Sequence, residues 1–213
     1  MEQRYLSSTF EYIVQNYIEE DKREALNNFL SLIQSFEYAV VGGVAVSVWY
    51  NGVRAISPED FDVKILPSEE KQLLKVLKEN GFKLERKNAF MDSLWFVFKK
   101  DGQGFDVGIV EKEWDIIGIK TAKSFNYKGH LVKVIPIEYL IVSKLFAGRR
   151  KDYKDVVFLL KSGKVDFQTI RIAVKRFIPS ELEELENLII YAKQFDVKDI
   201  NKLFEELQDG EEK

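Results

Sequence analysis

The length, composition and charge of the chain exclude several classes of protein. Its 213 residues, 46% of them hydrophobic and 31% charged, are typical of a folded globular protein with a large core. Cysteine is absent and histidine occurs once, which excludes disulfides, thiol nucleophiles and zinc sites built from Cys or His, and a formal net charge of −3 gives no global attraction to nucleic acid.

A glycine pair follows the first predicted strand. Two helices are predicted over residues 5–36, with a break near residues 19–21. A short apolar strand over residues 37–41 then leads into Gly42 and Gly43, and residues 44–50 have the pattern of a helix that starts at this turn. Backbone N–H groups at a helix start bind phosphate, so this order indicates a phosphate site. The alternative is a tight strand-to-helix connection without a ligand.

Two polar residues near the glycine pair can likewise be interpreted as phosphate ligands or as residues without a ligand. Ser47 lies one turn into the predicted helix, where its hydroxyl either adds to the phosphate site or packs as a small residue. Arg54, in the loop that follows, either contacts phosphate or is a plain surface arginine. The sequence leaves both interpretations open.

Two later strands repeat the pattern Phe-Asp-Val-x-Ile, at residues 61–65 and 105–109. Because side chains alternate along a strand, Asp62 and Asp106 lie on the face opposite to the apolar residues, and Asp60 shares the face of Asp62. If the strands are neighbours, the three carboxylates converge and repel one another, which a divalent cation with oxygen ligands, Mg²⁺ or Mn²⁺, relieves. The alternative is a solvated strand face, but Asp is disfavoured in strands, which favours the metal site.

The remaining pattern completes a mixed α/β (α+β) chain. Strands are predicted over residues 60–66, 82–86, 94–99, 105–110, 123–127 and 131–135. A helix opened by Pro67 ends at residues 80–81, and the turn over residues 101–104 leads into the second acidic strand. From Pro136 onward the pattern is helical, with breaks near Gly148, Gly163 and Pro179. We therefore expect a domain over residues 1–135, a mixed β-sheet with helices on one face, and a C-terminal helical bundle over residues 136–213.

The C-terminal region carries a lysine on an apolar helix stripe. The stripe begins at Ile137 and places Lys144 at i+7, where it either extends to the solvent rim or, in a cleft, supplies a point charge for phosphate. Asp152 and Asp155 lie on the inward side of the next helix. They are either carboxylates favoured at a helix start by the dipole or part of a site.

These motifs together resemble those of the nucleotidyltransferase superfamily, which shares its fold with DNA polymerase β. The glycine motif, the paired metal carboxylates and the third carboxylate of that superfamily are matched by Gly42-Gly43, Asp60-Phe61-Asp62 and Asp106. The AbiEii-like and MenT-like toxin branch is matched by Val134-Ile135-Pro136, Tyr139-Leu140, Lys144-Leu145-Phe146-Ala147, Arg149, Lys151-Asp152 and Asp155. The resemblance covers about residues 38–163, and the chain departs from it where Gly43 replaces a common serine.

The resemblance implies an Mg²⁺-dependent nucleotidyltransferase that moves a nucleoside monophosphate (NMP) from a nucleoside triphosphate (NTP) to a hydroxyl acceptor. It implies that Asp60 and Asp62 hold the metals, and that Asp106 completes the site and helps to deprotonate the acceptor. The triphosphate is expected to meet Gly42, Gly43, Ser47, Arg54 and Lys144, with Asp152 or Asp155 also in the active site. The expected acceptor is an RNA 3′ end, such as that of tRNA, or a protein side chain, and the expected setting is a toxin–antitoxin system with a cognate protein partner.

Two other functions fit the same residues. One is a non-catalytic module on this fold that binds nucleotide or a partner, as an antitoxin or regulatory protein. The other is an RNA-binding protein that uses the basic cluster of Arg149, Arg150, Lys151 and Lys154. The N-terminus has no signal pattern and the longest apolar run, residues 39–50, is too short to cross a bilayer, so we expect a cytoplasmic protein without a membrane role.

Overall fold

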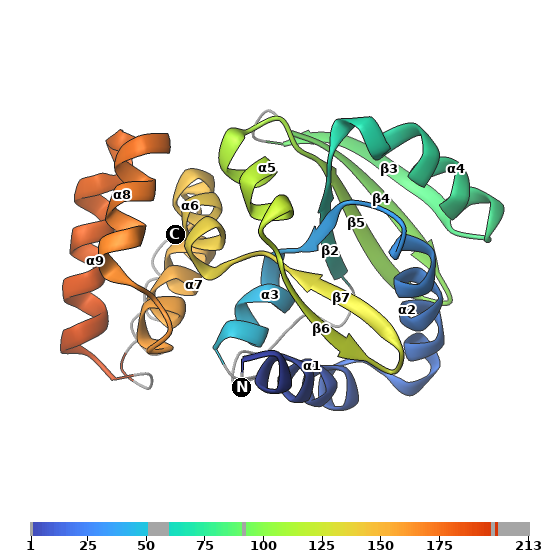
Figure 1. Ribbon diagram of the computed structural model, residues 1–213, viewed down its shortest axis with the longest axis horizontal. Coiled ribbons are helices and arrows are strands. Elements are labelled where there is room, and N and C mark those ends of the chain that lie inside the picture. The colour runs from blue at the N-terminus through green and yellow to red at the C-terminus, as the bar shows by residue number, and fades with distance from the viewer. Residues whose placement is uncertain (1, 51–59, 91–92, 197–198, 200–213) are drawn as a thin grey trace, which may run out of the picture. The chain divides into compact units, whose positions relative to one another are not determined.

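The chain divides into two compact units, Met1–Leu140 and Ile141–Lys213. The computed structural model describes residues 2–50, 60–90, 93–196 and 199, and Figure 1 traces their elements. The first unit contains a β-sheet and its helices, and the described residues of the second form helices and their connections. The boundary between them falls inside helix α6 (Ile137–Ala147).

A mixed sheet forms the centre of the first unit (Figure 1). Its strands within the described residues are β1 (Tyr38–Val40), β2 (Asp60–Ile65), β3 (Lys83–Phe90), β4 (Ser93–Lys100), β5 (Gln103–Ile109), β6 (Lys123–Tyr127) and β7 (His130–Val134). Their order across the sheet is β3-β4-β5-β2-β1-β7-β6. β2 pairs with β5 and β1 with β7 in parallel, and the other neighbours are antiparallel. The expected mixed sheet is confirmed.

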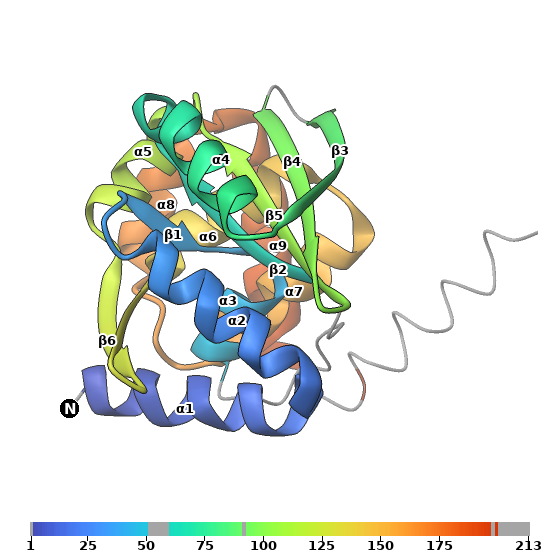
Figure 2. The same ribbon diagram turned by 90° about the vertical axis from the view of Figure 1, so that its right-hand side faces the viewer.

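Aromatic side chains hold helices against one face of this sheet. The helices in the described part of the first unit are α1 (Glu2–Tyr17), α2 (Glu20–Ile33), α3 (Gly42–Trp49), α4 (Glu70–Glu79, preceded by the 3₁₀ turn Pro67–Glu69) and α5 (Glu113–Lys120). α5 contacts the opposite face, where its Asp115 forms an ion pair with Lys64 of β2. The ring of Phe29 in α2 stacks on Phe105 at 4.5 Å between centroids and meets Phe61 edge-on at 6.0 Å. All three side chains are fully buried, and each such burial stabilises the fold by about 1.5–3 kcal/mol. Figure 2 shows α2 and α4 lying across this face.

The second unit is built from α7 (Arg150–Lys161), α8 (Phe167–Phe177) and α9 (Leu182–Gln194), together with the end of α6. Gly148 and Gly163 have φ of +62° and +72°, the left-handed conformation that ends helices, and Pro179 opens a 3₁₀ turn before α9. Asp166 caps α8 by accepting from the backbone N–H groups of Gln168 and Thr169. The predicted breaks and the C-terminal helical region are therefore confirmed.

Two local predictions differ from the structure. α5 forms between two predicted strands, in a segment for which no element was predicted; its β-branched residues and Gly118 give it low intrinsic helix propensity. Packing overrides that propensity, because a Cβ on Gly118 would lie 2.9 Å from Ile135 Cδ1. The predicted turn over residues 101–104 is shorter. Only Asp101 and Gly102 have positive φ, as a two-residue hairpin turn requires, and Gln103 already belongs to β5.

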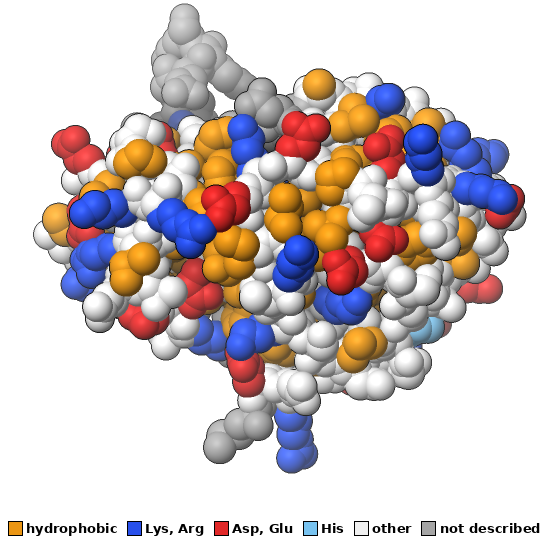
Figure 3. Space-filling view, turned by 45° about the horizontal axis from the view of Figure 1, so that its top comes forward, with side chains coloured by type: hydrophobic (Ala, Val, Ile, Leu, Met, Phe, Trp, Pro, Cys, Tyr) orange, Lys and Arg blue, Asp and Glu red, His pale blue; other side chains and the backbone are white. Residues whose placement is uncertain are grey.

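Charge is mixed rather than segregated on one face of the molecule. On the face drawn in Figure 3, acidic and basic side chains alternate with apolar ones, in keeping with 32 basic and 35 acidic residues in the chain. Within the described part of the chain, no helix has both the length and the apolar character that a bilayer crossing requires.

Candidate active site

The two strands that carry the repeated motif are neighbours in the sheet. β2 and β5 run parallel, with Phe61 opposite Phe105 and Asp62 opposite Asp106. The phenylalanines face the helix-covered core, so alternation places Asp60, Asp62 and Asp106 together on the other face. We call this side the acidic face of the sheet. Asp60 is exposed, whereas Asp62 and Asp106 are partly buried.

The pKa of the Asp106 carboxyl group is raised well above its ordinary value. Burial is the largest cause, the negative charges of Asp62 and Asp60 also raise the pKa, the positive charge of Arg86 lowers it, and the pKa that results is about 7. Its Oδ1 is buried without a hydrogen-bond partner. A carboxylate oxygen that is buried without a hydrogen bond, beside two other carboxylates, is costly, so this position favours either a proton or a cation.

The glycine pair opens helix α3 directly against the acidic face. Gly42 has φ of +60°, and a Cβ built on it would lie 1.8 Å from Asp62 Oδ2 and 2.6 Å from Asp62 Cγ. Only glycine therefore fits both the backbone conformation and the space beside this carboxylate. The backbone N–H of Val41 donates to the carbonyl of Asp62 at 3.0 Å, which fixes the helix start beside the strand.

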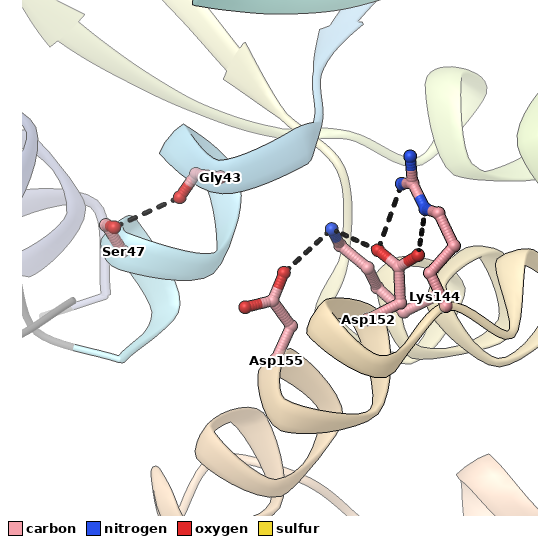
Figure 4. Close-up of polar contacts among 6 residues, drawn as sticks. Gly43, Ser47, Lys144, Asp152 and Asp155 are labelled. Atoms are coloured by element: carbon pink, nitrogen blue, oxygen red, sulfur yellow. Dashed lines mark hydrogen bonds and ion pairs between the residues drawn. The ribbon is translucent and has the colours of Figure 1, made fainter. Parts of the chain in front are cut away.

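Ser47 and Arg54 were the other residues expected near phosphate. Ser47 is fully buried, and its hydroxyl donates to the carbonyl of Gly43 at 3.0 Å (Figure 4). This contact fits the packing interpretation of Ser47. Arg54 lies outside the described residues.

A cluster of buried charges occupies the second unit (Figure 4). Lys144 Nζ lies 2.9 Å from Asp152 Oδ1 and 2.8 Å from Asp155 Oδ2, and both aspartates are 0% exposed. Arg149 adds a contact of 2.5 Å from its Nε to Asp152 Oδ2. Burial by itself would raise the pKa of Asp152, but the hydrogen bonds and charges of Arg149 and Lys144 outweigh it and lower that pKa. Lys144 therefore does not extend to the solvent rim; it is held between two carboxylates.

The donor chemistry of the acidic face fits a hard divalent cation. Asp60, Asp62 and Asp106 offer only oxygen ligands, and the orphaned Oδ1 of Asp106 has a vacant acceptor position. Within the residues that the structure describes, no group of three or more Asp, Glu or His side chains is already arranged to hold a metal ion. The exposed side chain of Asp60 is the one with most freedom to adjust.

Comparison with solved structures gives the fold. The crystal structure of ANT(2")-Ia in complex with adenylyl-2"-tobramycin matches 74% of this chain and 97% of its own, with a TM-score of 0.53 and 12% identity. The solution structure of the antibiotic-resistance factor ANT(2'')-Ia matches 78% of this chain and 98% of its own, with a TM-score of 0.52 and 13% identity. The protein has a nucleotidyltransferase-like fold. No protein-family model matches the chain, and no curated protein matches its sequence.

One buried ion pair beside the acidic strand was not expected from the sequence. Lys64 Nζ lies 2.6 Å from Asp115 Oδ2, and the pair joins β2 to α5 on the acidic face of the nucleotidyltransferase-like sheet. Lys64 is the variable position of the first repeated motif, two residues after Asp62, so alternation alone could have placed it there. Its partner could not be found, because α5 itself was not predicted.

Proposed function

We propose that the protein is a metal-dependent nucleotidyltransferase that moves an NMP from an NTP to a hydroxyl acceptor. The observation that carries this proposal is the register of β2 and β5, which sets Asp62 opposite Asp106, with Asp60 on the same face. Gly42 at the start of α3, in contact with the carboxylate of Asp62, supports a phosphate site beside it. The fold shared with ANT(2")-Ia, whose crystal structure holds adenylyl-2"-tobramycin, supports transfer of a nucleotidyl group.

Asp60, Asp62 and Asp106 would hold Mg²⁺ or Mn²⁺. When bound, the cation neutralises triphosphate charge and stabilises the departing pyrophosphate. The N–H groups at Gly42 and Gly43 would bind the triphosphate, because the first N–H groups of a helix have no partner within the helix.

Asp106 has the properties of a base for the acceptor hydroxyl. A bound cation would lower the pKa of Asp106 from the value of about 7 that it has in the metal-free protein, so the carboxylate would be charged at neutral pH and able to accept the hydroxyl proton. The acceptor oxygen attacks the α-phosphorus of the NTP, the bond from that phosphorus to the bridging oxygen of pyrophosphate breaks, and Asp106 takes the hydroxyl proton and later returns it to water.

Lys144 would counter the charge of the triphosphate, and Asp152 or Asp155 would complete the active site, as in the AbiEii-like and MenT-like branch. Two ion pairs hold the ammonium group in place but also offset its charge, so the resemblance supports this role and the geometry does not. Arg54 has the same proposed role.

The acceptor would be an RNA 3′ end, such as that of tRNA, or a protein side chain, and the activity would be that of a toxin with a cognate antitoxin. The ion pair between Arg149 and Asp152 offsets one positive charge of the basic cluster, which weakens its support for an RNA acceptor. A protein acceptor therefore belongs in every assay beside RNA.

Pyrophosphate release tests the proposal. Each NTP is incubated with Mg²⁺ and RNA, tRNA or protein acceptors, and wild type is compared with Asp62→Ala and with Asp101→Ala, a change in the exposed turn before β5. We expect Asp62→Ala to lose at least a hundredfold in rate and Asp101→Ala to keep the wild-type rate. Full activity in Asp62→Ala would contradict the assignment.

The same preparations separate the two alternatives. Mg-NTP binding by calorimetry without turnover would indicate a non-catalytic module. RNA binding that is steeply salt-dependent but indifferent to Mg²⁺ and to Asp62→Ala would indicate an RNA-binding protein.

A further inference from the structure

A β-bulge in β3 decides which way an arginine points. Leu84 pairs with Phe98 and Arg86 with Val97, so Glu85 is an extra residue opposite the regular strand β4. Without the bulge, Leu84 and Arg86 would lie on the same face, because side chains alternate along a strand. The extra residue keeps Leu84 on the helix-covered face and turns Arg86 to the acidic face.

Contacts on either side of Arg86 agree with this placement. Lys87 Nζ lies 5.2 Å from the ring centroid of Phe96, a residue 3% exposed on the helix-covered side of β4. Glu85 forms an ion pair with Lys99 of β4, with its Oε2 3.3 Å from Lys99 Nζ. The two basic side chains at positions 86 and 87 therefore leave the strand on opposite faces, and that of Arg86 is exposed.

Arg86 lies in one row of side chains with the catalytic candidates. Val97 pairs with Arg86 on one side and with Asp106 on the other, and Asp106 pairs with Asp62. Burial and the neighbouring carboxylates raise the pKa of Asp106, and the positive charge of Arg86 lowers it, in agreement with this proximity.

A tryptophan stands in the next row of the same face. Trp95 lies opposite Gly108 of β5, and a Cβ on Gly108 would lie 3.0 Å from the indole atoms Cη2 and Cζ2. The ring therefore covers the glycine, two residues beyond Asp106, and it is only partly buried. A partly exposed aromatic ring beside the proposed base offers a face on which another flat ring can stack.

The order of strands separates the two substrates. From β1 outward, the acidic face presents the Gly42 helix start, then Asp62, then Asp106, and then the β4–β3 side with Trp95 and Arg86. The triphosphate is assigned to the Gly42 side. A hydroxyl that gives its proton to Asp106 therefore approaches over β4 and β3.

We propose that Trp95 and Arg86 form the acceptor subsite, and that the acceptor carries a flat ring that stacks on Trp95 and an anionic group that Arg86 binds. This inference rests on the proposed function and names the chemistry of its second substrate. A guanidinium binds phosphate or carboxylate through two parallel hydrogen bonds, and an indole stacks on a heterocycle with little dependence on its identity. Neither interaction suits a polycationic acceptor.

Three probes test the ring-binding and anion-binding parts of the proposed subsite separately. Adenosine 5′-monophosphate has ring and anion, adenosine has the ring, and ribose 5-phosphate has the anion. Each is titrated into the full chain by NMR, with Mg²⁺ and a saturating non-hydrolysable ATP analogue to fill the donor site. The indole N–H signal of Trp95 is assigned by its loss in Trp95→Phe.

We expect the monophosphate to bind wild type about tenfold more tightly than either fragment. Arg86→Gln should abolish the preference for the monophosphate over adenosine, because the anion loses its partner. Trp95→Leu should abolish the preference for the monophosphate over ribose 5-phosphate, because the ring loses its partner. Trp95→Phe keeps an aromatic ring and should retain most of that second preference. Lys87→Gln removes the same charge from the opposite face and should behave as wild type. In turnover, Arg86→Gln should raise the KM of an anionic acceptor about tenfold and leave the KM of the NTP unchanged.

The outcomes separate failure of this inference from failure of the proposed function. If Asp62-dependent pyrophosphate release is present but neither Arg86→Gln nor Trp95→Leu changes any probe affinity, the subsite is wrong and the proposed function stands. If Arg86→Gln changes only the pH profile of kcat, Arg86 is a charge partner of Asp106 and the inference is again overturned. If no NTP yields pyrophosphate, the proposed function fails, and the acceptor role with it.

Discussion

Asp106→Asn is expected to stabilise the metal-free protein at neutral and alkaline pH. The folded-state pKa of this carboxyl is about 7, raised by burial and by two neighbouring carboxylates from an ordinary value of 3.8. Because the folded pKa lies above the unfolded one, the contribution of Asp106 to stability is complete below about pH 4 and is lost as the pH rises through 7. Asparagine has the same shape and does not titrate, so it escapes this loss.

The pKa difference sets the size of the effect. A change from 3.8 to about 7 corresponds to about 4 kcal/mol for a group fully removed from water. Asp106 is only partly buried, so solvent screening reduces this to about 1–2 kcal/mol. For a chain of this length, that free energy corresponds to a rise in Tm of about 2–8 °C.

The assay is urea unfolding at several pH values between 4 and 9 in the presence of EDTA. The difference in unfolding free energy between Asp106→Asn and wild type should grow from pH 4 to pH 7 and then level off. Asp101→Asn, in the exposed turn, controls for the change in net charge. Mg²⁺ at a hundred times its Kd should then stabilise wild type by about 2.7 kcal/mol, and Asp106→Asn by less. A difference that does not vary with pH would refute the crowding of the carboxylates on β2 and β5.

Two further predictions each have a matched control. Lys144→Met leaves two buried carboxylates without their lysine and should lower the free energy of unfolding by about 3–5 kcal/mol in urea, whereas Arg171→Met breaks a half-exposed ion pair and should cost less than about 1 kcal/mol. Equal losses would contradict the burial of the Lys144 cluster. Gly42→Ala should displace the Asp62 carboxylate and abolish Mg²⁺ binding measured by calorimetry. Gly81 also has a positive φ, +83°, but a Cβ added there would have no neighbouring atom within 4 Å. Gly81→Ala should therefore lower the free energy of unfolding only by the backbone strain, about 1–2 kcal/mol. Unchanged Mg²⁺ affinity in Gly42→Ala would exclude Asp62 as a ligand.

Local patterns in the sequence determined much of the sheet and its chemistry. The alternation in Phe-Asp-Val-x-Ile separated the core side of both strands from their carboxylate side, because this rule acts between adjacent residues. Gly42 was identified in the same way, since the strand before it and the helix after it are both visible in a short window. The breaks at Gly148 and Gly163 follow from their own backbone preferences.

Only the tertiary structure decided what depends on a partner distant in the chain. The parallel register that sets Asp62 opposite Asp106 is a pairing between strands separated by β3 and β4, and no local pattern fixes it. The bulge that turns Arg86 to the acidic face exists only relative to β4, because an extra residue is defined by the strand opposite it. Lys144 could be assigned to a stripe from its spacing, but its two carboxylate partners required the packing of α7 on α6. Neighbouring residues thus fix which way a side chain leaves the backbone, and long-range pairing fixes what it meets there.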